Sequence, residues 1–100
     1  MSASHPVRAV GIAWYSRQDY RRALEIMDDA AELPRTFDQW LKRAEATERE
    51  IKRAGHIVVR AMIKPEEFAA WCGAKGLNTD GKARSQWATE FVRQQANDPL

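Results

Sequence analysis

Hydrophobic and polar residues alternate in two segments of the chain, residues 7–15 and 56–63, and this period of two predicts β-strands. In the first segment, the large side chains on one face are Val10, Ile12 and Trp14. The side chains on its other face are Ala9, Gly11, Ala13 and Tyr15. The second segment has Ile57, Val59, Ala61 and Ile63 on one face and Val58, Arg60 and Met62 on the other. If the large face of the first strand forms the core together with the Ile57 face of the second, Arg60 and Tyr15 lie on the Gly11 side of the sheet.

A period of about 3.6 residues predicts helices between and after the strands. The first helix begins after Ser16, a favourable N-cap with Asp19 three residues on, and its apolar side extends to Ala31. Its solvated side offers an Arg21–Glu25 pair at the i,i+4 spacing. The residues that favour the other helix ends are Thr36 and Gln39 as a capping box, Gly55, Pro65, Gly76, and either Asn78 or Thr79.

The predicted order of elements is therefore β-α-α-β-α-α, an α+β fold with a small sheet of two neighbouring strands packed with four helices. Two strands alone make a marginal sheet, so either the helices carry its stability or a second subunit extends it in a homodimer. If the strands are parallel, the starts of the first and third helices lie together at the carboxyl ends of the strands.

Length and composition fit one folded domain. One hundred residues, 44% of them hydrophobic and 30% charged, are typical of a single soluble domain over residues 1–100, with flexible ends at 1–5 and 95–100. The apolar runs are far shorter than the roughly 20 residues of a membrane helix, and the start does not have a signal-peptide pattern. The single cysteine, Cys72, excludes an internal disulfide. We expect a cytoplasmic protein.

The charge is small and nearly balanced. The formal net charge is +2, with eight basic and nine acidic side chains in residues 1–50 (−1) and eight and five in residues 51–100 (+3). Dedicated nucleic-acid binders concentrate positive charge on one face or helix, so this asymmetry is weak evidence for such a partner.

Three charged side chains point toward predicted apolar surfaces. On helical projection, Glu48 lies between Leu41 and Ala44, and Arg84 lies among the apolar residues of the last helix. Arg60 stands in an otherwise apolar strand. Because burying an unpaired charge costs several kcal/mol, we expect a structural ion pair of Glu48 with Arg84 or Arg60.

A ligand site is the alternative interpretation of the same residues. Small side chains beside Tyr15 and Arg60 leave room for a ligand on that side of the sheet, although close helix packing is the more common use of such residues. Exposed N–H groups at the starts of the first and third helices, with Arg17 nearby, are a further candidate for a small anion, but acidic residues already occupy both helix starts. The candidate ligand-binding residues are Tyr15, Arg17, Glu48, Arg60 and Arg84.

Complete catalytic and metal-binding motifs are missing from the sequence. Cys72 has no neighbouring base, and its position in an apolar stripe favours a buried structural thiol. His5 and His56 are too scattered for a zinc site, and the chain contains no glycine-rich phosphate loop. We therefore expect a protein that is not an enzyme and uses no cofactor.

Several short stretches, "GIAWY", "TFDQW", "GHIVVR" and "PEEFAAWC", make the chain similar to a family of small bacterial proteins with no assigned activity. The similarity extends over most of the chain. It implies one bacterial α+β domain and no particular substrate, cofactor or catalytic residue.

The leading functional hypothesis is a protein-interaction or regulatory module that binds a protein partner, or a second copy of itself, through a helix face or an exposed strand edge. The second hypothesis is nucleic-acid binding with Tyr15 as a stacking residue, through Arg17, Arg21, Arg22, Arg53, Arg60 and Lys64. The third is a small anionic ligand or a weak enzymatic activity around Glu48, Arg60, Arg84 and Tyr15.

Overall fold

A computed structural model describes residues 7–97 of the chain, and it confirms the α+β fold and the β-α-α-β-α-α order. The elements are β1 (Ala9–Trp14), α1 (Arg17–Ile26), the short 3-10 helix η1 (Ala30–Glu32), α2 (Phe37–Arg53), β2 (Ile57–Met62), α3 (Pro65–Lys75) and α4 (Gly81–Asn97). Of the ends expected to be flexible, residues 1–5 and 98–100 lie outside the described residues, and residues 95–97 belong to α4. Within the described range, every helix is too short or too polar to cross a membrane.

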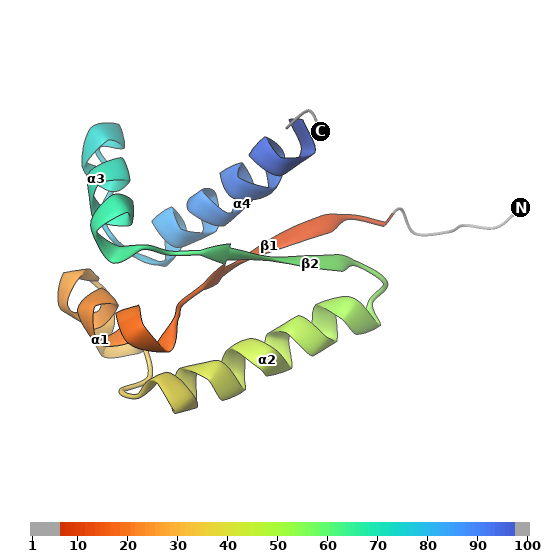
Figure 1. The fold of residues 1–100 in the computed structure, drawn as a ribbon, viewed down its shortest axis with the longest axis horizontal. Coiled ribbons are helices and arrows are strands. Elements are labelled where there is room, and N and C mark those ends of the chain that lie inside the picture. The colour runs from red at the N-terminus through yellow and green to blue at the C-terminus, as the bar shows by residue number, and fades with distance from the viewer. Residues whose placement is uncertain (1–6, 98–100) are drawn as a thin grey trace, which may run out of the picture.

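The two strands form one parallel sheet, and the helices surround it on three sides (Figure 1). Helix α2 covers one face and α4 covers the opposite face, where it packs more extensively against β1 than against β2. Helices α1 and α3 lie side by side at the carboxyl ends of the strands, as expected for parallel strands. This arrangement gives the two faces of the sheet different neighbours.

The strand register overturns the expected position of Arg60. Ile12 lies opposite Arg60 and Gly11 lies opposite Val59, and residues paired in this way point to the same face. Arg60 therefore shares the face of Ile12 and Trp14, beneath α2, and not the face of Gly11. Its guanidinium carbon lies 4.0 Å from the centre of the Trp14 ring, so an aromatic face and an acidic residue of α2 accommodate this charge.

Helix boundaries follow the predicted signals at most ends, including Pro65 in the first turn of α3 and Gly55 just after α2, where φ is 95°. The Ser16 side chain accepts a hydrogen bond from the Asp19 N–H, and Thr36 and Gln39 form the reciprocal capping box of α2. Gly76 ends α3 in the left-handed conformation, with φ of 68°, which a glycine adopts without steric cost.

Two predicted boundaries were wrong for a common reason. Helix α1 ends at Ile26, before Ala31, and α4 is capped by Asp80, whose carboxylate accepts a bond of 3.0 Å from the Ala83 N–H. Asn78 or Thr79 was expected to be this cap. The Thr79 hydroxyl instead donates to the Ile26 carbonyl at 2.7 Å, and its backbone carbonyl accepts from the Asp28 N–H at 2.9 Å. These long-range bonds tie the end of α1 to the α3–α4 connection, so both helix limits depend on contacts that the local sequence does not show.

Gly11 sets the distance between α4 and the sheet. A Cβ atom at this position would lie 2.5 Å from the Ala88 carbonyl oxygen and 2.8 Å from a Val92 methyl carbon. The small face of β1 therefore allows a helix backbone to approach the strand directly, which is the close-packing use of small residues. The large face instead joins an aromatic cluster in the core, in which Trp14 packs edge-on against Trp40.

Candidate functional site

The five candidate ligand-binding residues do not form one site. Glu48 and Arg60 make the expected ion pair, with two parallel bonds of 2.8 Å between α2 and β2. The Glu48 side chain is 10% exposed, whereas that of Arg60 is 47% exposed. The hydrogen bonds from Arg60 lower the pKa of Glu48 below its ordinary value, because they favour the carboxylate. This pair fastens α2 to the sheet and satisfies both charges.

Arg84 pairs with Asp29 and not with Glu48. Its guanidinium donates bonds of 2.7 and 2.8 Å to the two carboxylate oxygens, and the two side chains are only 13% and 17% exposed. Asp29 also accepts a bond of 3.1 Å from the Gly81 N–H. Hydrogen bonds from Arg84 lower the pKa of Asp29. The sequence pattern missed this partner because helical projection placed Asp29 on the solvated side of the first helix, whereas α1 ends at Ile26 and Asp29 lies in the turn that follows.

The two ion pairs lie on opposite sides of the sheet, so Glu48, Arg60 and Arg84 do not line a common pocket. Arg60 reaches α2, whereas Arg84 belongs to α4 on the other face. Glu48 and Arg84, the two charged residues within apolar helical stripes, are therefore explained by structural ion pairs. Glu48, Arg60 and Arg84 therefore do not form the cluster of catalytic groups that the weak-enzyme hypothesis requires.

Tyr15 is a core residue. It is 2% exposed and packs edge-on against Tyr20 and Trp40, with ring centres 5.5 and 5.1 Å away. Its hydroxyl has no hydrogen-bond partner among the described residues, and burial raises the pKa of Tyr15 to about 12. A ring buried in this way is not available to stack on a nucleic-acid base.

Arg17 points away from the helix starts. Its side chain donates a bond of 2.8 Å to Asp38 and lies over the Phe37 ring, 4.7 Å from its centre. The starts of α1 and α3 do come together and form a pocket of about 370 Å³ lined by Ser16, Gln18, Asp19, Lys64, Pro65, Glu66 and Glu67. Three carboxylates in that lining complement the positive helix ends, so the expected anion site already has its negative charges.

The arginines proposed to contact nucleic acid are partly neutralised by neighbouring acids. Arg22 donates to Glu66 and, at 3.0 Å, to Glu25. The expected Arg21–Glu25 pair is therefore replaced by a pair with the adjacent arginine, because Arg22 bridges α1 to α3. Arg21 has no ion-pair partner among the described residues.

Cysteine and metal chemistry gain no support from the geometry. Cys72 is 1% exposed, and burial raises the pKa of its thiol, which lowers the fraction of reactive thiolate. Among residues 7–97, no group of three or more histidine, cysteine, aspartate and glutamate side chains is arranged to hold a metal ion.

The outer edge of β1 carries hydrogen-bonding groups that the rest of the fold leaves free. The Ile57 N–H donates to the Arg8 carbonyl and the Ile63 N–H donates to the Trp14 carbonyl. In a parallel ladder, alternate residues face the partner strand, so the even-numbered residues of β1 bond to β2. The N–H and C=O groups of Gly11 and Ala13 consequently point away from β2, and they bond to no described residue.

A groove of about 480 Å³ runs along this edge. Its floor is the strand itself, from Val10 to Ala13. One wall is Ile51 of α2, and the residues of the other wall belong to the start and middle of α4: Gly81, Arg84, Ser85, Ala88 and Thr89. The open strand edge thus lies between two helices, with an apolar wall on one side and mostly small side chains on the other.

The outer edge of β2 is better protected. The indole N–H of Trp87 donates to the Met62 carbonyl at 3.2 Å and caps the end of that edge. Arg60, which carries a charge, stands in the middle of the strand. Charged side chains and covering groups are the usual devices that protect an edge strand from pairing. The β1 edge has no charged residue between Ala9 and Trp14.

Comparison with known proteins adds no functional information: no family model, curated protein or solved structure matches the chain. The fold presents two kinds of surface to a partner or ligand, the open strand edge and the pockets between helices.

Proposed function

We propose that this protein is a protein-interaction module that binds an extended peptide segment of a partner along the free edge of β1. The observation that carries the proposal is the set of outward-pointing backbone groups of Gly11 and Ala13 at the floor of a groove between α2 and α4. Main-chain hydrogen bonds supply affinity in this mode of recognition, and pockets for alternate side chains supply specificity. A third strand would also strengthen the sheet, which has two strands within residues 7–97.

The groove favours a particular side-chain pattern in the bound segment. A residue opposite Gly11 would direct its side chain toward the α4 wall, at Ser85 and Thr89, where the helix lies close to the strand. Its neighbours would point toward Ile51 on the α2 side. The preferred segment therefore alternates small residues with larger apolar ones, in keeping with the period of two along a strand.

A second copy of the chain fits this edge poorly. Antiparallel pairing of β1 with its own copy would place the two strands about 4.8 Å apart, with both α4 helices on the same face of the joined sheet. Packed helices need about 8–10 Å between their axes. Because α4 lies over β1 and touches it at Gly11, the two helices would collide. The proposal is accordingly a different protein as partner, in the cytoplasm, where a lone cysteine stays reduced.

Peptides selected from a random-sequence display library on the immobilised protein test this function. We expect enriched peptides with the small–apolar alternation, and saturable binding of the synthetic peptides. In hydrogen-exchange measurements, the peptide should newly protect the amides of Gly11 and Ala13. The Ile12 amide, which faces β2, should be protected with or without the peptide.

The matched variants are Ser85→Arg and Gln86→Arg. Both residues are exposed neighbours on α4, but only Ser85 lines the groove. Ser85→Arg should weaken peptide binding at least about tenfold by filling the groove, and Gln86→Arg should leave it unchanged despite the same added charge. If no peptide is enriched, or if the enriched peptides bind both variants equally, the strand-edge function is wrong.

A further inference from the structure

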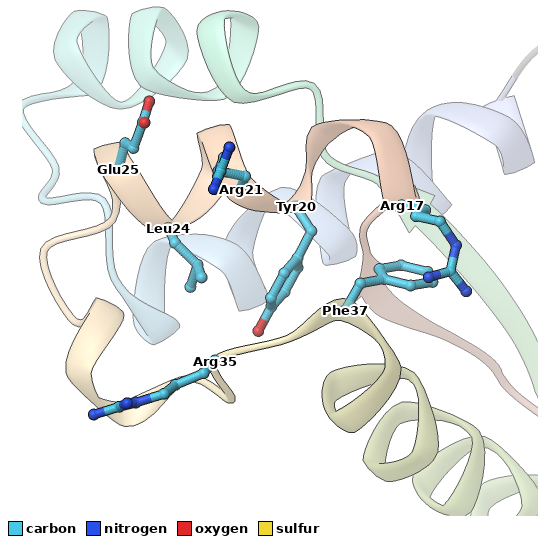
Figure 2. Close-up of a pocket in the computed structure, with 7 residues that line it drawn as sticks. All are labelled: Arg17, Tyr20, Arg21, Leu24, Glu25, Arg35 and Phe37. Carbon is cyan, nitrogen blue, oxygen red and sulfur yellow. The ribbon is translucent and has the colours of Figure 1, made fainter.

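A second pocket, separate from the β1 groove, lies between α1 and the segment that leads into α2 (Figure 2). Its volume is about 390 Å³, and its lining residues are Arg17, Tyr20, Arg21, Leu24, Glu25, Arg35 and Phe37. Figure 2 shows the side chains of Leu24, Tyr20 and Phe37 between the helix and this segment, where they form an apolar floor. No residue of the pocket belongs to the β1 groove.

The floor of the pocket is held in place by its neighbours. The Tyr20 hydroxyl donates to the Pro34 carbonyl, which joins α1 to the segment opposite. Phe37 packs against both Tyr20 and Trp40, with ring centres 6.0 and 5.4 Å away. Arg17 lies over the Phe37 ring and is bonded to Asp38. An apolar surface fixed by so many contacts is already formed before a ligand binds, which lowers the ordering cost of binding.

The rim of the pocket has an excess of positive charge. Arg17 is neutralised by Asp38, and Glu25 is bonded to Arg22 outside the pocket. Arg21 and Arg35 are exposed and have no ion-pair partner among the described residues. Two unpaired arginines therefore line the pocket from opposite sides, Arg21 on α1 and Arg35 on the segment before α2, and Figure 2 shows the Arg35 side chain extended outward. Each presents a planar fork of donors that matches the oxygens of a carboxylate or a phosphate.

We infer that this pocket binds a small organic anion with a flat apolar body, which rests on the floor between Leu24 and Phe37, and a carboxylate or phosphate group at the rim, which the exposed Arg21 and Arg35 side chains would turn to bind. The volume is within the range of small-molecule sites. The mainly apolar floor suits the apolar body of such a ligand, and the unpaired cationic groups at the rim suit its negative charge. Carboxylate and phosphate share this chemistry, and the experiment separates them.

Four probes divide the recognition into its parts: naphthoate, naphthyl phosphate, naphthol and inorganic phosphate. Titrations followed by amide and side-chain NMR should show saturable binding of naphthoate, naphthyl phosphate or both, with shifts at Leu24 and Phe37. The stronger of the two identifies the preferred anion. Naphthol lacks the charge and inorganic phosphate lacks the apolar body, so each should bind at least about tenfold more weakly.

Paired variants test the arginines. Arg21→Gln/Arg35→Gln should weaken the binding of the preferred probe at least about tenfold, because hydrogen bonds to charged groups are the stronger class. The control is Arg53→Gln/Arg93→Gln, which removes the same charge from two other exposed arginines and should leave binding within about twofold, since distant surface charges are screened by salt. Ser85→Arg, in the β1 groove, should also leave binding unchanged, so the two proposals fail independently.

Three results would overturn the anion site. The first is the absence of saturable binding by either naphthyl anion, and the second is equal binding by naphthol. The third is equal loss of binding in the two double variants, which would mean general electrostatic attraction. A blocked Asp-Phe-Asp peptide serves as the last probe; if it binds at Leu24 and Phe37 while both naphthyl anions fail, the pocket holds a protein segment and the small-anion assignment is wrong.

Discussion

On the α4 face of the sheet, Gly11 allows the helix backbone to touch the strand, whereas on the α2 face Ile12, Trp14 and Arg60 separate helix from strand. Each face also has one arginine–carboxylate pair. Arg84–Asp29 on the α4 side is 13% and 17% exposed, and Arg60–Glu48 on the α2 side has one partner 47% exposed. The arginine–carboxylate ion pair therefore occurs in two environments, one largely shielded from water and one partly exposed to it.

This contrast has an energetic consequence. A charge that loses its partner in a shielded place keeps its desolvation cost, whereas a half-exposed arginine can be hydrated again. In addition, a backbone contact cannot adjust to an added atom as a long side chain can. The α4 face should therefore be the more sensitive of the two to substitution.

The largest effect is expected from Arg84→Met, which retains apolar bulk but leaves Asp29 without its partner. Loss of one member of a buried pair costs about 3–5 kcal/mol, and the residual exposure of this pair places the expected loss near the lower limit. Urea unfolding measures it. The Asp29→Asn/Arg84→Met double variant removes both charges and should regain part of the loss. If Arg84→Met loses less unfolding free energy than Glu48→Gln does, the α4 face is not the more sensitive one and the contrast between the faces is wrong.

Gly11→Ala tests the backbone contact on the same face. Because the new Cβ would meet the Ala88 carbonyl oxygen at 2.5 Å, α4 must shift, and we expect a loss of about 1–3 kcal/mol. Gly73→Ala on α3 is the matched control, since its added Cβ would meet no heavy atom within 4 Å apart from its chain neighbours and the backbone of its own helix. A glycine in the interior of a helix is destabilising relative to alanine, so the control should gain about 0.5–1 kcal/mol. Equal effects at the two glycines would exclude close packing as the role of Gly11.

Glu48→Gln tests the α2 face. Glutamine keeps the shape of the side chain and one acceptor oxygen, while Arg60 stays on the Trp14 ring and is partly hydrated. We expect a loss of about 1–2 kcal/mol, the range for hydrogen bonds to charged groups reduced by solvent screening. Urea unfolding under the conditions used for Arg84→Met gives the direct comparison.

The Glu48→Gln deficit should depend on pH. The pKa of Glu48 is lower in the folded protein than its ordinary value of 4.5, so the unfolded state binds the proton first. The stability contributed by the carboxylate is therefore fully present above pH 4.5 and is lost as pH falls through the lower, folded pKa. The difference between wild type and Glu48→Gln should shrink over that acid range. A difference that stays constant would show that packing, and not charge, causes the deficit.

The sequence predicted the elements whose signals are local. The capping box at Thr36, the glycine cap at Gly76 and the alternation in both strands each depend on residues close together in the chain. Burial of Glu48 was also predictable, because an acid within an apolar helical stripe must face the core. These features need no information about how the strands pair.

The register could not be predicted in the same way. A shift of one residue exchanges the two faces of a strand, and nothing local fixes which face of β2 meets which helix. This is why Arg60 was placed on the Gly11 side. The partner of Arg84 is 55 residues away, in a turn, and the anion pocket depends on Arg35, in the connection before α2. All three depend on tertiary contacts between segments distant in the chain.

Tyr15→Phe should have the smallest effect at neutral pH, although the residue is buried at the end of β1, between the two faces. Its hydroxyl has no partner among the described residues, so its removal breaks no described hydrogen bond and should cause no loss of stability. In alkali the two proteins should diverge. The folded pKa of about 12 exceeds the ordinary 10.0, so wild-type stability is intact below pH 10 and falls as pH rises toward 12, by about 2–3 kcal/mol. Urea unfolding between pH 10 and 12 should show that Tyr15→Phe does not undergo the fall in stability that ionisation of Tyr15 causes in the wild type. If the neutral-pH loss of Tyr15→Phe instead approaches that of Gly11→Ala, the hydroxyl has a structural role in the core.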